Sequence, residues 1–259
     1  MREHSPVTAS YALDIGRYTL GVDERVLSGT TAAWARLTTG IASFHQLPAV
    51  GKSGSSIPCL AKSVNADLAS GCFVALGFEA PMWLPIRRGH SRSLRLFAPR
   101  FSEERQHEWY VNAGAAATLK ALSLGIMLFS LIRAGNPNVR LTTDTGCTTP
   151  NAIALFEAFV VEDFKLPKHR KSARVIPSDD EWDAFLASLA WGALKRSFSV
   201  PASTTPRLLH AAGSEPAEIL SIWRTIASNV PSLSPVGGPP DCDVVALAEN
   251  TSARTRPLQ

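Results

Sequence analysis

Carboxylates at three separate places in the chain are the side chains most able to do chemistry. Asp14 ends a short apolar run, Glu79 ends a nearly continuous one, and Asp179, Asp180 and Asp183 open an otherwise apolar helix. Magnesium prefers such hard oxygen ligands and keeps several waters, so one or two carboxylates per ion suffice when rigid elements hold them. Two ions about 3.5 to 4 Å apart can activate a water and stabilise the leaving oxygen of a phosphodiester. The pattern predicts a carboxylate site for divalent metal.

Strands are expected to carry the first two acids. Residues 11–17 read as a first strand, 18–26 as its antiparallel return and 30–39 as a third strand, which together would open a mixed sheet. Residues 72–79 are apolar until the glutamate, as in a buried central strand. Residues 152–161 read as a further strand that contains Glu157.

Helices are expected on the faces of this sheet. Residues 57–68 are compatible with a short helix, residues 103–133 contain apolar side chains spaced by three or four, and residues 178–196 form the helix that the acids open. Strands followed by alternating helices and strands predict an α/β fold with a mixed central sheet.

Each acid also has a structural interpretation. Asp14 precedes a glycine by two positions, a pattern that begins many turns. Glu79 needs a cation or metal beside it, or must point into solvent, because an unpaired buried carboxylate costs several kcal/mol. Ser178 and Glu181 have the spacing of a capping box. Capping leaves Asp183 unexplained, since it shares a helix face with the preceding aspartates, where like charges repel.

The chain resembles the ribonuclease H-like superfamily, in particular RuvC-type resolvases and an uncharacterised branch of nucleases, over residues 11–194. Asp180-Glu181-Trp182-Asp183-Ala184-Phe185 resembles the acidic start of the family's late helix, Asp14 in Leu13-Asp14-Ile15-Gly16 its first-strand aspartate, and Glu79 before Ala80-Pro81 the acid that ends its fourth strand. Many members of that branch have aspartate where Glu79 stands and a glycine-rich turn after the first aspartate.

The resemblance implies that Asp14, Glu79, Asp180 and Asp183 are catalytic and bind Mg2+ or Mn2+. Glu157 resembles a glutamate of the branch's fifth strand and is a secondary candidate, with pairing to a nearby Lys or Arg as the alternative. By the same resemblance, residues 1–200 form a ribonuclease H-like domain with helices flanking a mixed central sheet.

Basic residues follow or precede the acids. Positive charge without any acid occupies residues 80–102, and a second basic group leads into the acidic helix. Such clusters bind phosphate backbones, although a run of charge is usually a solvated loop. The candidates for substrate binding are Arg87, Arg88, Arg92, Lys168, Arg170 and Lys171, with His169 as a weak candidate for an acid/base helper.

Composition limits the class of protein. The 259 residues, 45% of them hydrophobic, suit one main domain, and residues 201–259, rich in Pro and Ser, read as an irregular, partly flexible appendage with one helix at 216–228 and a small edge strand at 244–247. Four scattered cysteines without a paired spacing give no sign of a zinc or disulfide framework. The apolar run at 113–132 contains Lys120, which favours a buried helix over a membrane span. A soluble cytoplasmic protein is expected.

Three functions remain open on these grounds. The first is metal-dependent hydrolysis of nucleic-acid phosphodiesters. The second is a non-catalytic ribonuclease H-like module that binds nucleic acid or protein through its basic loops. The third, an actin-like kinase, suits Asp14-Ile15-Gly16 but has little room for two lobes. The Gly51-Lys52-Ser53 run lacks the upstream glycine of a phosphate-binding loop. The sequence does not indicate the oligomeric state.

Overall fold

The structure is a computed structural model of the whole chain. The residues that it describes are 8–16, 32–38, 41–47, 57–87, 113–143, 149–160, 178–194, 204–209, 217–221, 230, 234–235 and 243–249.

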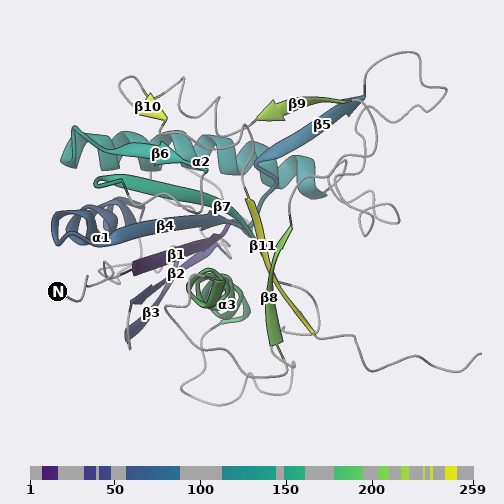
Figure 1. Cartoon of the computed structure of the whole chain (residues 1–259), viewed down its shortest axis with the longest axis horizontal. Coiled ribbons are helices and arrows are strands. Elements are labelled where there is room, and N and C mark those ends of the chain that lie inside the picture. Colours follow the sequence, from purple (N-terminus) through teal and green to yellow (C-terminus); the bar gives the residue numbers. More distant parts are fainter. Residues whose placement is uncertain are drawn as a thin grey trace, which may run out of the picture.

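The described part is an α/β fold whose centre is a nine-stranded mixed sheet (Figure 1). One path through the sheet runs β10-β6-β7-β4-β1-β2-β3, and β11 and β8 continue from β7. The strands of this sheet are β1 (Thr8–Asp14), β2 (Ala33–Thr38), β3 (Ile41–Gln46), β4 (Phe73–Phe78), β6 (Arg140–Thr142), β7 (Ala152–Val160), β8 (Thr204–Leu209), β10 (Ser234–Pro235) and β11 (Asp243–Glu249).

Strand direction changes twice along that path, between β1 and β2 and again between β2 and β3. The first three strands of the chain are antiparallel neighbours, whereas β1, β4 and β7 are parallel to one another. Parallel strands buried on both faces are expected to be apolar throughout, and β4 and most of β7 are. The carboxyl ends of β1, β4 and β7 therefore lie on one edge of the sheet, where ligands bind in many open α/β sheets.

Helices cover both faces of the sheet. Helices α1 (Ile57–Ala69) and α2 (Ala113–Gly135) pack on one face, and α3 (Asp179–Leu194) packs on the other, against β1 and β2 (Figure 1). The larger core lies under α1 and α2 and includes Leu13, Phe78 and Phe129. The smaller core lies under α3, where alanines of the sheet allow the helix to approach closely.

Gly77 shows how close this approach is. A Cβ atom built at Gly77 would lie 2.4 Å from the ring of Phe156, and that ring stacks on Trp191 of α3 with ring centroids 4.6 Å apart. A side chain at position 77 would force the aromatic layer to move. The strand that leads to Glu79 therefore carries glycine where it passes below this layer.

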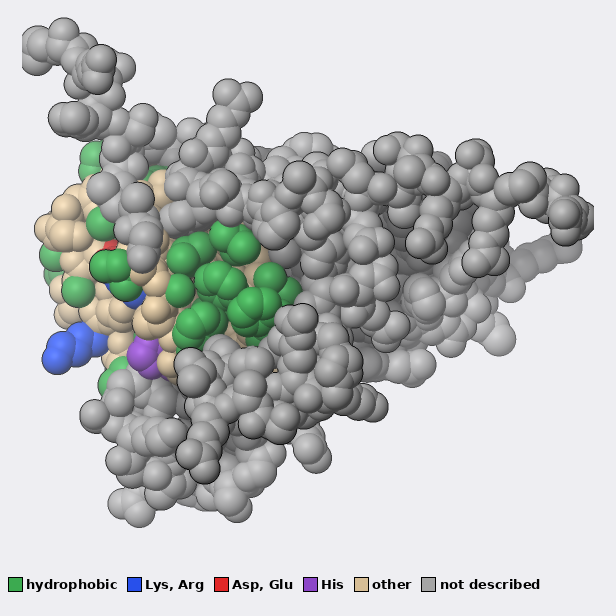
Figure 2. Space-filling view, turned by 90° about the horizontal axis from the view of Figure 1, so that it is seen from below, with side chains coloured by type: hydrophobic (Ala, Val, Ile, Leu, Met, Phe, Trp, Pro, Cys, Tyr) green, Lys and Arg blue, Asp and Glu red, His purple; other side chains and the backbone are tan. Residues whose placement is uncertain are grey.

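A second group of aromatic side chains lies where α3 contacts β3 and borders the smaller core. Phe185 contacts both Trp182 and Phe44, with ring centroids 5.3 and 5.2 Å apart, and all three side chains are half-buried. Seen from the side of α3, hydrophobic side chains gather in one area of the described surface (Figure 2). Scattered apolar side chains are normal at a protein surface, but a contiguous group is less so.

The expected mixed sheet with flanking helices is confirmed at this level, and several elements differ from expectation. Strands β3, β6, β8, β10 and β5 (Trp83–Arg87) were not predicted, and residues 18–26 lie outside the described part. Residues 201–259 were expected to be an irregular appendage, but β8, β10 and β11 from this range belong to the nine-stranded sheet. The helix expected at 216–228 is wrong at its start, because residues 217–221 form strand β9 (Ala217–Ser221), which pairs antiparallel with β5. The strand expected at 244–247 exists as β11, but β7 and β8 flank it, so it is not an edge strand.

Helix α2 is the long apolar helix expected from the sequence. Among the described residues it is the one helix long and apolar enough, by length and composition, to cross a membrane, over Ala116–Gly135. Five of its side chains are nevertheless buried in the larger core, namely Ala121, Leu124, Leu128, Phe129 and Ile132. Its exposed side includes Leu119, at 68% exposure, and serines. The cytoplasmic location stays a prediction.

Candidate metal site

Asp14 and Glu79 lie side by side because their strands are parallel neighbours. Leu13 of β1 is paired with Phe78 of β4, and the N–H of Glu79 donates to the carbonyl of Leu13 at 2.9 Å. Successive side chains of a strand point to opposite faces. Leu13 and Phe78 point into the larger core, so Asp14 and Glu79 both point to the α3 face.

The turn after β1 fixes the Asp14 carboxylate. The N–H of Gly16 donates to Asp14 Oδ1 at 2.9 Å, and Gly16 has φ +37°, a left-handed conformation that favours glycine. The turn expected at Asp14-Ile15-Gly16 is therefore present. It does not exclude a role in a site, because the Asp14 carboxyl also shares a hydrogen bond with the carboxyl of Glu79.

This carboxyl pair has an unusual electrostatic state. Burial raises the pKa of Asp14 to about 10, together with the charge and hydrogen bond of Glu79 and, less strongly, the charge of Asp180. The Gly16 N–H acts in the opposite direction. At neutral pH the two carboxyls therefore hold one proton between them, in the position where a cation would otherwise balance their charge.

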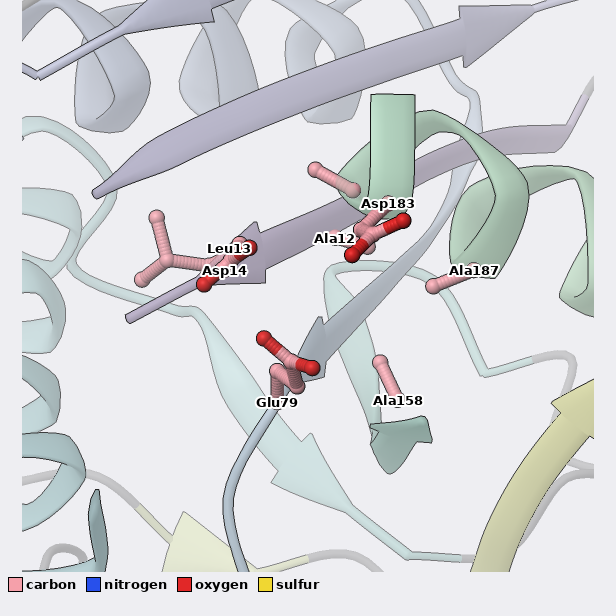
Figure 3. A pocket seen from close by; sticks show the side chains of 8 residues that line it. Ala12, Leu13, Asp14, Glu79, Ala158, Asp183 and Ala187 are labelled. Atoms are coloured by element: carbon pink, nitrogen blue, oxygen red, sulfur yellow. The ribbon is translucent and has the colours of Figure 1, made fainter. Parts of the chain in front are cut away.

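Helix α3 brings the other two acids to the same place. A small pocket is lined by Asp14 and Glu79 from the sheet and by Asp183 from the helix, with alanines as its walls (Figure 3). Asp183 is 7% exposed, whereas Asp180, one turn earlier, is half-buried. Asp180 does not line the pocket, but its charge raises the pKa of Asp14. The structure thus places three of the four predicted acids around one pocket, with the fourth, Asp180, near enough for its charge to act on Asp14.

The start of α3 is a capping box. The N–H and hydroxyl of Ser178 donate to Glu181 Oε2 at 2.9 and 3.0 Å, and the N–H of Glu181 donates back to Ser178 Oγ at 3.3 Å. Capping therefore accounts for Ser178 and Glu181. It gives no role to Asp183, which lies further along the helix and faces the pocket.

The donor set fits a hard divalent cation in chemistry, because it consists of carboxylate oxygens on rigid elements. Within the ranges that the structure describes, no three His, Cys, Asp or Glu side chains are spaced as a formed metal site. Carboxylates without a cation repel one another, and here Asp14 and Glu79 share a hydrogen bond in the pocket that Asp183 also lines. Binding of a cation would require the shared proton to leave.

Glu157 lies on the other face of the sheet. Its neighbours Phe156 and Ala158 face α3, so the strand periodicity turns Glu157 toward the face covered by α2. It is fully buried, and its Oε1 accepts the backbone N–H of Met82 at 2.5 Å. One partner of Glu157 is thus a backbone amide, and the pairing with a Lys or Arg stays a prediction.

The predicted substrate-binding residues fall largely outside the described part. Arg87 ends β5, but its side chain is not among those described. The other residues outside the described ranges are Arg88, Arg92, Lys168, His169, Arg170 and Lys171.

Sequence reasoning missed the alanines that line the pocket and a lysine on the other face of the sheet. Ala12, Ala158, Ala184 and Ala187 line the pocket. Lys120 of α2 donates to the carbonyl of Gly16 at 3.0 Å, immediately after the Asp14 turn. The available signal for Lys120 was its position as a lone charge inside a long apolar helix.

Comparisons of the chain with protein-family models, with curated proteins and with solved structures found no match.

Proposed function

We propose that the protein is a divalent-metal-dependent hydrolase of nucleic-acid phosphodiesters, with a ribonuclease H-like carboxylate site. Asp14, Glu79, Asp180 and Asp183 would hold Mg2+ or Mn2+, and nucleic acid would be the partner. The observation that carries the proposal is the Asp14–Glu79 pair, two acids 65 positions apart whose carboxyls share a hydrogen bond in a pocket that Asp183 also lines, with Asp14 buried and Glu79 half-buried. Such groups cluster at functional sites far more often than elsewhere.

The positions of the acids agree with the resemblance seen in the sequence. Asp14 ends the first strand, Glu79 follows the fourth, and Asp183 comes from the late helix that packs on the first two strands. These are the places that the resemblance to the ribonuclease H-like superfamily gives to its acids. This agreement in order and place supports that fold and that class of site over an unrelated α/β fold.

The side chains can perform separate tasks in such a reaction. A bound divalent ion would lower the pKa of a water and stabilise the charge on the leaving oxygen. Asp14 and Glu79 would provide oxygens from rigid strand ends, and their shared proton would leave as the ion binds. Asp183 would close the site from the helix, and Asp180 would lie at its rim. Alanine side chains form the walls of the pocket beside the carboxylates.

A Mn2+ titration by calorimetry tests the proposal, comparing wild type with Asp14→Asn, Glu79→Gln and Asp183→Asn. We expect wild type to bind Mn2+ with release of about one proton, and the three variants to bind at least tenfold more weakly, since buried ligands are being replaced. Asp179→Asn is the matched control, because Asp179 lies in the same first helical turn as Asp180 and is absent from the pocket. Cleavage of labelled DNA and RNA with Mn2+ should follow the same ranking.

One observation favours a second candidate, a non-catalytic ribonuclease H-like module. The carboxyls of Asp14 and Glu79 already share a hydrogen bond, which compensates the pair without a cation. In that case the Asp14–Glu79 proton is permanent, and the heats of Mn2+ titration are negligible and equal in all variants. Binding of nucleic acid without cleavage would then support the module.

A further inference from the structure

The segment that carries Glu79 is held from the far side of the sheet. After β4 the chain turns through Ala80, Pro81 and Met82, all buried. A buried backbone amide must find a partner within the protein. The N–H of Met82 donates to Glu157 Oε1, and the carbonyl of Pro81 accepts the hydroxyl of Thr118 at 3.3 Å.

The segment that follows Asp14 is held from the same side. Lys120 Nζ donates to the carbonyl of Gly16 at 3.0 Å, and the N–H of Gly16 in turn donates to Asp14 Oδ1. Thr118 and Lys120 are two positions apart in α2. One helix therefore contacts both of the turns that end the acid-bearing strands.

A fully buried glutamate such as Glu157 needs a physical reason, because burying a carboxyl group is costly even when it is hydrogen-bonded. The carboxyl pair on the opposite face of the sheet supplies such a reason. Asp14 and Glu79 repel each other whenever both are ionised, and that repulsion acts to separate the two strand ends. Contacts that fix the following turns oppose the separation.

We propose that Glu157, Thr118 and Lys120 are positioning residues that hold the turns after β4 and β1 from the far face of the sheet, so that Glu79 and Asp14 stay close enough to share one cation. The inference rests on the proposed metal site and deepens it. Glu157 is then a support for the ligands and not itself a ligand. Outer residues of this kind set the affinity of a metal site through the orientation of its ligands.

Two variants of Glu157 distinguish the role of its hydrogen-bond acceptor oxygen from the role of its negative charge. Glu157→Gln keeps an oxygen that accepts the Met82 N–H, whereas Glu157→Leu fills a similar volume without an acceptor. We expect Glu157→Leu to weaken Mn2+ binding by about 10- to 100-fold in calorimetry, the range typical of such supports. Glu157→Gln should bind within about threefold of wild type, a rescue not expected if the carboxylate itself were a ligand.

Two milder variants keep the test open if Glu157→Leu does not fold. Lys120→Met removes the ammonium group and keeps the alkyl stem, and its matched control is Lys62→Met on the exposed side of α1. Thr118→Val removes only the hydroxyl. We expect Lys120→Met and Thr118→Val to weaken Mn2+ binding severalfold and Lys62→Met to leave it unchanged.

Amide hydrogen exchange, measured on the same variants without metal, distinguishes a failure of the positioning role from a failure of the proposed metal site. Faster exchange confined to residues 79–82 in Glu157→Leu, with wild-type exchange in Glu157→Gln, supports the positioning role even if wild type binds no Mn2+ and the proposed function fails. If wild type binds Mn2+ and the folded Glu157→Leu, Lys120→Met and Thr118→Val variants bind it equally well, the positioning role is overturned and the metal site stands. Unchanged exchange at residues 79–82 also overturns it.

Discussion

A buried aspartate lies against each face of the central sheet, and the two have opposite surroundings. Asp67 of α1 is 5% exposed and Asp14 of β1 is 6% exposed. Asp67 accepts two hydrogen bonds from the Arg36 guanidinium, at 2.6 and 2.8 Å, and one from the Tyr11 hydroxyl. Asp14 faces a second carboxyl, that of Glu79.

Asp67 and Asp14 are almost equally buried, but their partners differ. This difference distinguishes a structural carboxylate from a proposed metal ligand. The charge of Asp67 is compensated within the fold, because the guanidinium and the hydroxyl satisfy both of its oxygens. Burial and the Asp67 hydrogen bond raise the pKa of Tyr11, and the hydrogen bond to Asp67 raises that of Arg36, so both stay donors. Asp14 reaches neutrality only through a proton, which leaves it able to exchange that proton for a cation. The comparison indicates a role in folding for Asp67, and the proposed function gives Asp14 a role in chemistry.

The largest effect on stability is expected at the compensated aspartate. Asp67→Ala leaves the Arg36 guanidinium and the Tyr11 hydroxyl without their acceptor and should lower the free energy of unfolding by about 2 to 3 kcal/mol, at the lower end for a broken buried pair because Arg36 is 24% exposed. Urea unfolding measures it, and Mn2+ affinity should not change. Asp179→Ala is the control. A loss below about 0.5 kcal/mol, the range of ordinary surface changes, would show that the pair is not a structural support.

The sequence predicted the elements on which both aspartates depend better than it predicted their neighbours. The apolar runs around β1, β4 and β7 and the periodic residues of α1 and α3 give these elements directly. Strand β3, with Ser43, His45 and Gln46, has no such signal, because its pairing with β2 makes it a strand. The helix signal at Pro216 was overridden in the same way by pairing with β5.

For the site, the sequence supplied the acids but not the reason that they meet. Asp14 and Glu79 become neighbours through the parallel pairing of β1 with β4, and Asp183 joins them through the packing of α3 on one particular face. Neither is encoded in a local pattern. The far-side contacts of Lys120 and Glu157 depend on the position of α2, so their roles could not be predicted from spacing.

The second prediction concerns pH and has a sign opposite to that of an aspartate whose pKa is lowered by a cationic partner. The pKa of Asp14 is raised to about 10 from 3.8, so between these values the folded state binds more protons than the unfolded state. Stability should therefore fall as pH rises from about 4 toward 10. Asp14→Asn removes this dependence and should be more stable than wild type at pH 8, by about 1 to 2 kcal/mol after allowance for relaxation of the pair.

Unfolding curves at several pH values, with and without Mn2+, test this difference. Mn2+ should restore the stability of wild type at high pH and leave Asp14→Asn unaffected. Asp67→Asn provides the contrast, because its loss of stability should not be recovered by the ion. Wild-type stability that is flat between pH 5 and pH 9 would mean that Asp14 ionises without cost, and the comparison between the two aspartates would lose its basis.

The third prediction concerns the hydrogen bond from the Tyr11 hydroxyl to Asp67, the aspartate whose charge is compensated. Tyr11→Phe removes the hydroxyl that donates to Asp67 and contacts Ser63, while the Arg36–Asp67 pair persists. We expect a loss of about 1 to 1.5 kcal/mol, the contribution of a hydrogen bond to a charged group, from urea unfolding. In the Asp67→Ala background the same change should cost less, because the acceptor is already gone. Equal losses in the two backgrounds would show that the hydroxyl acts independently of Asp67.

The smallest predicted effect on stability distinguishes the two roles of acids in α3, which are helix capping and the proposed metal binding. Ser178→Ala removes the reciprocal cap and should lower stability by about 1 kcal/mol without changing Mn2+ affinity. Asp183→Asn should leave stability equal or slightly higher, because it removes a negative charge beside the Asp14–Glu79 pair, and should abolish Mn2+ binding. If Asp183→Asn instead destabilised the protein as much as Ser178→Ala while Mn2+ still bound, Asp183 would belong with Asp67 among the structural acids, and the cation would have to be held by the strand-end pair without help from the helix.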